Sequence, residues 1–322
     1  MGVTRIIKRA TSVTILVLLL YYVIDIEGFN WSYLNNFSDL IIFLVILIAG
    51  LYMNGLQLYI MLKNQSVNLS LIDQFLLPVS MALFGYLVPV NGGMLFSLFF
   101  MKKKLSVDIK EGLSIGVYSL YISFLLTGLI GFLYCIFYNN QLVVILPLSF
   151  ILILFPLIVN IITFNLDKVK LKKMPFLGKV TGFLRNVSVS SNSQFKNRRS
   201  LIQLLIINVL MIVVHIASTY WLISMLNLKV PLLSVALITL FMRMSSLVRV
   251  FPGNIGIDEL FAGGIFAFFG LSPSDGIVLV IYSRVIALLF LLIPGGLLHI
   301  YLNRKVLKLE NLKDLKGIFT TT

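Results

Sequence analysis

Long apolar runs alternate with short basic or polar segments along most of the chain. A helix needs about 20 apolar residues to cross about 30 Å of hydrocarbon, and six of the runs reach that length. We therefore predict an all-α, polytopic membrane helix bundle with spans at Ala10 to Ile26, Ser38 to Leu62, Gly112 to Tyr138, Leu142 to Leu166, Leu201 to Leu226 and Ile277 to Leu302. The first run has a basic flank but no small-residue cleavage site, which predicts a retained span rather than a signal peptide.

Two further apolar regions, Asp73 to Met101 and Pro231 to Gly270, are interrupted by turn-forming residues. Because each half of these regions is too short for a full crossing, we predict two broken or re-entrant helix pairs. The interrupting residues are Pro78, Pro89, Asn91, Gly92 and Gly93 in the first region and Pro252, Gly253, Asn254 and Gly256 in the second.

The two broken regions also resemble one another. A Tyr-Ser pair follows the proline of each break at nearly the same distance, Tyr118-Ser119 after Pro89 and Tyr282-Ser283 after Pro252. This pattern predicts a duplication inside a single integral membrane domain, residues 1–322, with repeat 1 at about 63–138 and repeat 2 at about 227–302. The predicted topology inverts one copy relative to the other, an arrangement typical of alternating-access carriers. Irregular backbone at membrane depth must be buried or line a wet cavity, so we expect the breaks to face a cavity.

Composition excludes the soluble classes of protein. Apolar residues make up 59% and charged residues 12% of the 322 residues, and the mean hydropathy is +1.02. The formal net charge of +14 does not indicate nucleic-acid binding, because the basic residues lie between apolar runs. Counting them places 22 on the side that carries both termini and only Lys229 on the other, which predicts a cell-membrane protein with both termini in the cytoplasm.

The segment 167–200 carries nine of these basic residues and is predicted to be a cytoplasmic loop. We expect it to bind anionic lipid head groups, because polybasic segments beside a membrane are attracted to the negative surface of that leaflet. The alternative is a solvated loop that only fixes the topology.

Charged residues also fall inside apolar sequence, and all of them lie in repeat 2: Arg243, Arg249, Asp258, Glu259 and Arg284. An arginine at a helix centre costs about 2.5–3.5 kcal/mol on insertion scales, so these residues require an explanation. One interpretation is a phosphate site built from the arginines and from the free amides of a half-helix that begins near Ile257. The other is that Arg249 and Arg284 neutralise the two acids as buried pairs, or extend their charged ends to the nearest membrane interface.

The segment Arg249-Val-Phe-Pro-Gly-Asn-Ile-Gly-Ile-Asp-Glu259 resembles the arginine, Pro-Gly-Gly-x-Gly-x-x-Glu segment of the lysylphosphatidylglycerol synthase transmembrane-region family, a flippase-like integral membrane domain. The similarity in layout covers nearly the whole chain. Asn254 replaces the second glycine of the motif, Asp258 is an additional acid, and Gly93-Met94 stands where members often carry a Gly-Glu pair. The resemblance implies site residues in the motif and on the last span. With two further candidates, Arg243 and Asn91, the expected substrate-binding residues are Arg249, Pro252, Gly253, Asn254, Gly256, Asp258, Glu259, Arg284, Arg243 and Asn91.

The leading hypothesis is a carrier, not an enzyme, for a phosphate-bearing polar-headed lipid: a phospholipid, an aminoacylated phospholipid or a polyprenyl-phosphate glycolipid. No cofactor or metal is expected, and the expected partners are membrane lipids and a separate lipid-modifying enzyme. The soluble aminoacyl-transfer domain of bifunctional family members is not expected in this chain. Two alternatives remain open: a small-anion transporter, and a membrane glycosyltransferase or its accessory subunit, in which Asp25 and Glu27 would bind a metal.

Overall fold

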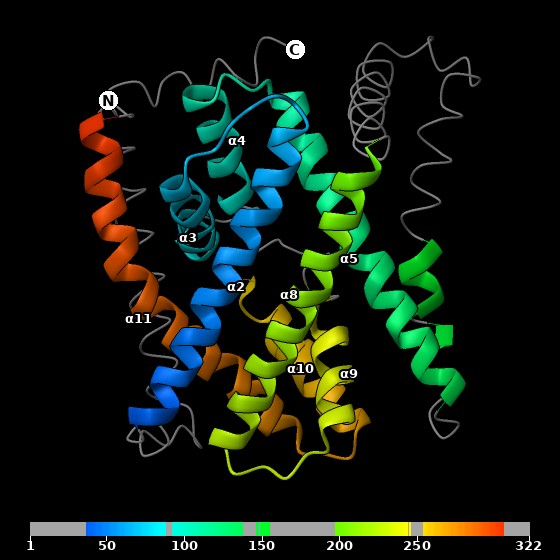
Figure 1. The fold of residues 1–322 in the computed structure, drawn as a ribbon. Coiled ribbons are helices and arrows are strands. Elements are labelled where there is room, and N and C mark those ends of the chain that lie inside the picture. The colour runs from blue at the N-terminus through cyan, green and yellow to red at the C-terminus, as the bar shows by residue number, and fades with distance from the viewer. Residues whose placement is uncertain are drawn as a thin grey trace, which may run out of the picture.

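The computed structural model describes residues 37–87, 92–137, 146–147, 149–154, 197–243, 245 and 254–305, with Leu87, Phe137 and residues 293–305 described by their backbone alone. Regular structure in these ranges is helical, without strands. The principal helices are α2 (Phe37–Lys63), α3 (Leu71–Leu87), α4 (Gly92–Lys104), α5 (Ile109–Phe137), α8 (Arg198–Met225), α9 (Leu232–Met242), α10 (Ile257–Phe268) and α11 (Pro273–Lys305) (Figure 1).

Four helices within the described ranges are long and apolar enough to cross a membrane: α2, α5, α8 and the first part of α11. They coincide with four of the predicted spans, Ser38 to Leu62, Gly112 to Tyr138, Leu201 to Leu226 and Ile277 to Leu302. The chain is therefore a multi-pass helical membrane protein. The predicted span Ala10 to Ile26 lies outside the described residues, as does most of Leu142 to Leu166 and of the basic loop 167–200.

Local sequence explains where the long helices begin and end. Asp39 lies in the first turn of α2 and Lys63 in its last turn, where each charge complements the helix dipole. The side chain of Asn197 caps α8 by accepting a hydrogen bond from the backbone N–H of Ser200. The Ser200 hydroxyl in turn donates to Asn64 Oδ1 at 2.6 Å, which joins the upper ends of α8 and α2.

Each broken region forms two helices that are too short to cross a bilayer alone. Helices α3 and α4 have 17 and 13 residues, and α9 and α10 have 11 and 12. The ammonium of Lys104, at the end of α4, lies 2.5 Å from the carboxylate of Asp73, at the start of α3, so this pair begins and ends at one end of the bundle. The pair α3 and α4 lies in the upper half of Figure 1, and the pair α9 and α10 lies in the lower half.

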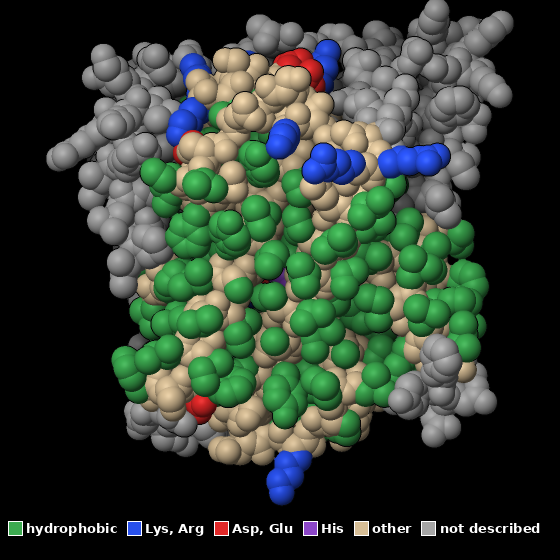
Figure 2. Space-filling model, in the orientation of Figure 1, with side chains coloured by type: hydrophobic (Ala, Val, Ile, Leu, Met, Phe, Trp, Pro, Cys, Tyr) green, Lys and Arg blue, Asp and Glu red, His purple; other side chains and the backbone are tan. Residues whose placement is uncertain are grey.

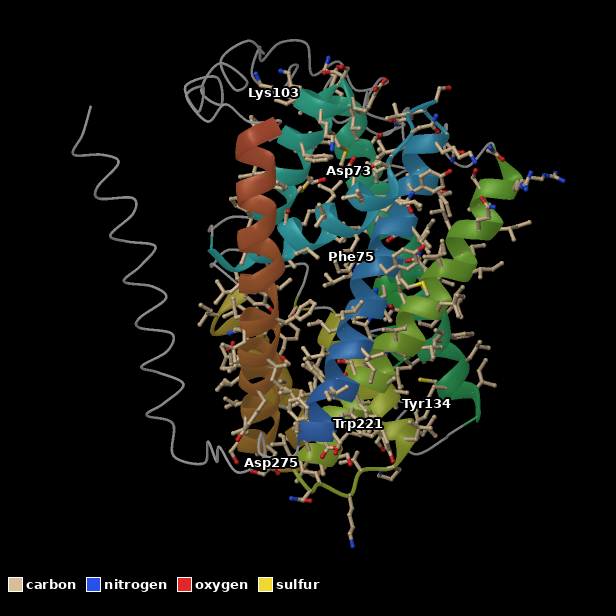
Figure 3. All side chains as sticks on the ribbon, turned by 60° about the vertical axis from the view of Figure 1, so that its left-hand side comes forward. Asp73, Phe75, Lys103, Tyr134, Trp221 and Asp275 are labelled. Atoms are coloured by element: carbon tan, nitrogen blue, oxygen red, sulfur yellow. The ribbon has the colours of Figure 1, made fainter. Side chains whose placement is uncertain are left out.

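The two ends of the bundle are marked by different residues. Asp73 and Lys103 lie at the upper end and Trp221 and Asp275 at the lower end (Figure 3). The Trp221 indole donates to the backbone carbonyl of Asp39 at 3.1 Å and so joins α8 to α2 there. A broad band of hydrophobic side chains covers the visible face between the two ends (Figure 2), as expected for a surface in contact with lipid.

The interior is divided between the two short-helix pairs. An upper apolar cluster joins α2, α3 and α5 through residues such as Met61, Leu77 and Ile115. A lower cluster joins α8, α9, α10 and α11 through residues such as Ile223, Ile238, Phe266 and Ile286. Each short-helix pair therefore contributes to an apolar cluster of its own.

Candidate functional site

The candidate site is built around the start of α10, which is held by a tight turn and a cap. Gly256 is the N-cap residue and has a φ of 83°, a left-handed conformation that favours glycine. The carboxylate of Glu259 reaches back and accepts a hydrogen bond from the backbone N–H of Gly256, with N and Oε2 2.8 Å apart. This cap fixes the position of the Glu259 side chain and leaves its second oxygen for another donor.

That donor is Arg284 on α11. Its Nη1 donates to Glu259 Oε1, and its Nη2 donates to Asp258 Oδ2 at 3.3 Å. The side chains of Arg284 and Glu259 are only 6% and 8% exposed, whereas that of Asp258 is 28% exposed. The guanidinium of Arg284 therefore donates hydrogen bonds to two carboxylates. Together, Arg284, Glu259 and Asp258 carry a formal net charge of −1. Asp258 is the member that remains most open to a ligand.

The depth of this cluster follows from helix geometry. Arg284 is the twelfth residue of α11, which begins at the lower end with Pro273. At about 1.5 Å of rise per residue, Arg284 lies about 16 Å along the helix from that end. This distance is about half of a hydrocarbon layer that is about 30 Å thick.

Asn254 connects the charged cluster to the end of α9. Its Nδ2 donates to Asp258 Oδ1 at 2.6 Å and to the backbone carbonyl of Ser245 at 3.1 Å. Its φ of 56° is left-handed, a conformation that asparagine tolerates better than most residues. The second glycine of the Pro-Gly-Gly motif would allow the same left-handed backbone at position 254 but could not make either hydrogen bond. The Asn254 side chain therefore links Asp258 to Ser245, a role that the motif alone did not indicate.

Arg243 lies at the C-cap of α9 and faces another helix. Its Nη2 donates to the Ser123 hydroxyl at 2.8 Å, which joins α9 to the middle of α5. Sequence reasoning missed both Ser123 and Ser245, because serine is common in membrane spans and nothing in its spacing marks it as functional.

The structure thus brings together five of the predicted site residues, Asn254, Gly256, Asp258, Glu259 and Arg284. Arg243 is two positions before Ser245, whose backbone carbonyl accepts from Asn254. Four predicted residues, Arg249, Pro252, Gly253 and Asn91, lie outside the described residues, as do Asp25 and Glu27. Of the two interpretations of the intramembrane charges, the contacts of Arg284 are those of a neutralising pair, buried with Glu259 and partly exposed with Asp258. Its phosphate-binding role stays a prediction.

The outer face of α10 carries a different feature next to these charges. A shallow apolar hollow is lined by Leu260, Phe261, Gly264 and Ile265. Leu260 is 76% exposed, and a side chain added at Gly264 would enter open space. The hollow follows directly after Asp258 and Glu259 in the helix. Charged groups and an apolar surface therefore adjoin on one short helix.

A family model described as the lysylphosphatidylglycerol synthase TM region matches residues 8–295 of the chain. Comparisons with curated proteins and with solved structures found no match.

Proposed function

Because the chain belongs to the lysylphosphatidylglycerol synthase transmembrane-region family, we propose that it moves a lipid with a phosphate-bearing polar head group between the leaflets of the cell membrane. The observation that carries this proposal is the buried cluster of Arg284, Glu259 and Asp258 at mid-depth. Intramembrane ionisable groups are costly and mark substrate pathways by default. A head group that crosses the bilayer needs such polar contacts at the midplane.

The order and direction of the helices support an inverted repeat. The series α2, α3, α4, α5 has the same pattern of long, short, short and long helices as the series α8, α9, α10, α11. Helix α2 runs upward and α8 downward, and the short pairs lie at opposite ends of the bundle (Figure 1). In this proposal six spans and two re-entrant pairs form one domain, and rocking of one repeat against the other exposes the site to each leaflet in turn.

The distribution of basic residues supports the orientation. The elements at the upper end carry Lys63, Lys102 to Lys104, Lys110, Arg198 and Arg199, whereas the connection between α8 and α9 at the lower end carries Lys229. By the positive-inside rule the upper end is cytoplasmic, and so are both termini. The basic segment 167–200 would then bind anionic head groups of the cytoplasmic leaflet.

The apolar hollow on α10 is the proposed position of the lipid tails. In this proposal the head group enters the polar site while the acyl or prenyl tails stay in the bilayer, against Leu260, Phe261 and Gly264. The chain itself is proposed to be a carrier without catalytic activity or cofactor, and a separate lipid-modifying enzyme would supply the head group.

The proposed function is tested by reconstitution into vesicles with fluorescent lipids in one leaflet. We expect the wild type to move a phosphate-bearing lipid, from a panel of phospholipids and prenyl-phosphate lipids, at a rate well above that of protein-free vesicles. Asp25→Asn should leave that rate unchanged. A metal-dependent product that disappears with Asp25→Asn would instead indicate the transferase, and uptake of phosphate ions without lipid movement would indicate the anion transporter.

Filling the hollow should slow lipid movement without harming the fold. Gly264→Leu adds a side chain to open space on the outer face of α10, so we expect the melting temperature to stay close to that of the wild type and the lipid translocation rate to fall several-fold. The control is Gly85→Ala in α3, where nothing lies within 4 Å of an added Cβ and no hollow is filled. Equal translocation rates in Gly264→Leu and the wild type would exclude the hollow as a tail site.

A further inference from the structure

Asn254 carries a buried side-chain oxygen to which nothing donates within the described structure. The residue is only 8% exposed, and its Oδ1 has no hydrogen-bond partner. The contacts fix which amide atom is which, because Nδ2 lies 2.6 Å from the Asp258 carboxylate and 3.1 Å from the Ser245 carbonyl, and both of these groups only accept. Buried polar groups are nearly always paired, so this oxygen calls for a donor or a cation from outside the chain.

Asp258 supplies negative charge beside this oxygen. Its Oδ1 accepts from Asn254, and its Oδ2 lies 3.3 Å from Arg284 Nη2. The Asp258 side chain is 28% exposed, whereas those of Glu259 and Arg284 are 8% and 6% exposed. One guanidinium faces two carboxylates, so the cluster of Arg284, Glu259 and Asp258 keeps a negative charge, and Asp258 is its accessible carboxylate.

Asp258 lies on the side of α10 that carries the apolar hollow. Asp258, Phe261 and Ile265 are spaced at i, i+3 and i+7, so they share one face of the helix, and the last two line the hollow. The opposite, buried face carries Ala262 and Phe266. The exposed side of the carboxylate therefore adjoins an open surface. A dehydrated monovalent cation needs no more space beside it than about one water molecule.

The neighbouring helix ends and charges also favour a cation at this position. Ser245 follows the C-terminal end of α9, which is the negative end of its helix dipole. The positive end of α10 is offset by Glu259, which accepts the backbone N–H of Gly256. Arg243 donates to Ser123 on α5. One positive charge brings the cluster of Arg284, Glu259 and Asp258 to neutrality, whereas a divalent ion would leave it positive.

We propose that the Asp258 carboxylate and the Asn254 Oδ1 bind a monovalent cation, and that this ion is sodium, which drives the movement of the lipid. Hard cations take oxygen ligands, and carriers with inverted repeats bind their coupling ions where helices are broken near the midplane. A lipid ammonium group has the same chemistry, so the test includes both sources of positive charge. The coupling role rests on the proposed function, whereas the cation site itself does not.

Bound sodium also changes what the cluster can accept. The cluster becomes neutral, so a phosphate that approaches Arg284 meets less repulsion from Asp258. A coupling of this kind is reciprocal, because each ligand raises the affinity for the other by the same factor. Sodium and a phosphate-bearing lipid should therefore bind cooperatively, as a coupling ion and its substrate must.

The test measures thermal unfolding of the full chain in detergent while sodium chloride replaces choline chloride at constant ionic strength. Choline is too large for a site of this size. A ligand that binds only the folded state raises the melting temperature with its concentration, so we expect a saturable rise for the wild type in sodium. Asp258→Asn should weaken the apparent sodium affinity about tenfold or more, because the charged ligand is lost, and Asn254→Gly about three- to tenfold.

Matched controls make the same two substitutions away from the site. Asp275→Asn removes a carboxylate from the first turn of α11, and Asn227→Gly replaces an asparagine whose φ of 57° is also left-handed. Both controls should keep the sodium affinity of the wild type. A purely structural role for Asp258 or Asn254 would lower the melting temperature by the same amount in sodium and in choline.

Lipid probes distinguish the two sources of positive charge. Short-chain phosphatidylglycerol has no ammonium group, and we expect the wild type to bind it about fivefold or more tightly in sodium than in choline. Stabilisation of the wild type by short-chain phosphatidylethanolamine but not by sodium, with loss of this effect in Asp258→Asn, would overturn the free cation as the ligand.

Equal melting temperatures of the wild type in sodium and in choline would overturn the sodium site, even if Asp258→Asn fails to fold. Wild-type sodium affinity in both site variants would do the same. Vesicle translocation separates this inference from the proposed function. Sodium binding that the two variants lose, without lipid movement by the wild type, would defeat the function alone. Lipid movement at one rate in sodium and in choline, by a wild type that binds no sodium, would defeat this inference alone.

Discussion

Replacing Arg284 with methionine will destabilise the protein by about 3–5 kcal/mol, because breaking a buried ion pair leaves an uncompensated charge in a low-dielectric interior. The guanidinium is 6% exposed and serves both Glu259 and Asp258. Methionine keeps much of the apolar volume of the side chain but cannot donate to either carboxylate. The measurement is thermal unfolding of the detergent-solubilised protein, compared with Arg199→Met at the start of α8.

A second substitution, added to Arg284→Met, removes the negative charge that the lost guanidinium leaves unpaired. In the Arg284→Met background, Glu259→Gln removes the buried carboxylate and keeps an oxygen that can accept from the backbone N–H of Gly256. We expect the double variant to recover most of the lost stability, because replacing a whole buried pair is often close to neutral. Wild-type stability in Arg284→Met alone would show that the pair is not part of the folded core.

Replacing Gly55 with alanine will disrupt the packing of α2 against α3. A Cβ built on Gly55 would overlap the backbone carbonyl oxygen of Gln74, which cannot move away as a flexible side chain could. Overpacking of this kind costs about 1–3 kcal/mol and occasionally more, and we expect a value at the upper end because backbone atoms collide. The measurement is the same thermal unfolding, together with the fraction of protein that remains monodisperse after extraction.

The matched control for Gly55→Ala is Gly85→Ala in α3, since an added Cβ at Gly85 has no atom within 4 Å. Alanine is favoured over glycine in a helix by up to about 1 kcal/mol, so this control should be neutral or slightly stabilising. Equal melting temperatures for the two variants would show that the close approach of α2 and α3 does not exist in the folded protein.

The hydrophobic pattern was sufficient to predict where the long helices lie, because spanning a bilayer requires a run of apolar residues of defined length. Glycine clusters likewise located the two breaks, since Gly92 and Gly256 lie at the starts of α4 and α10. The prediction that Pro78 interrupts its region was wrong, because α3 continues through this proline from Leu71 to Leu87. These signals are local in sequence, and local structure follows from them directly.

The contacts inside the site could not be predicted in the same way. Arg284 and Glu259 are 25 residues apart, and Arg243 and Ser123 are 120 apart. Which arginine meets which partner depends on how the short helices pack, and the apolar positions on α9 and α11 have no clear period. The sequence therefore left two interpretations of the arginines open, and the geometry of α9, α10 and α11 was needed to assign their partners.

The most direct test of the account is the rate at which the folded double variant Arg284→Met/Glu259→Gln moves a phosphate-bearing lipid across vesicle membranes, relative to the wild type. We predict rapid movement by the wild type and a rate close to that of protein-free vesicles for the double variant, although its melting temperature is nearly restored. Movement at the wild-type rate by the double variant would contradict the claim that the buried charges at mid-depth serve the lipid head group.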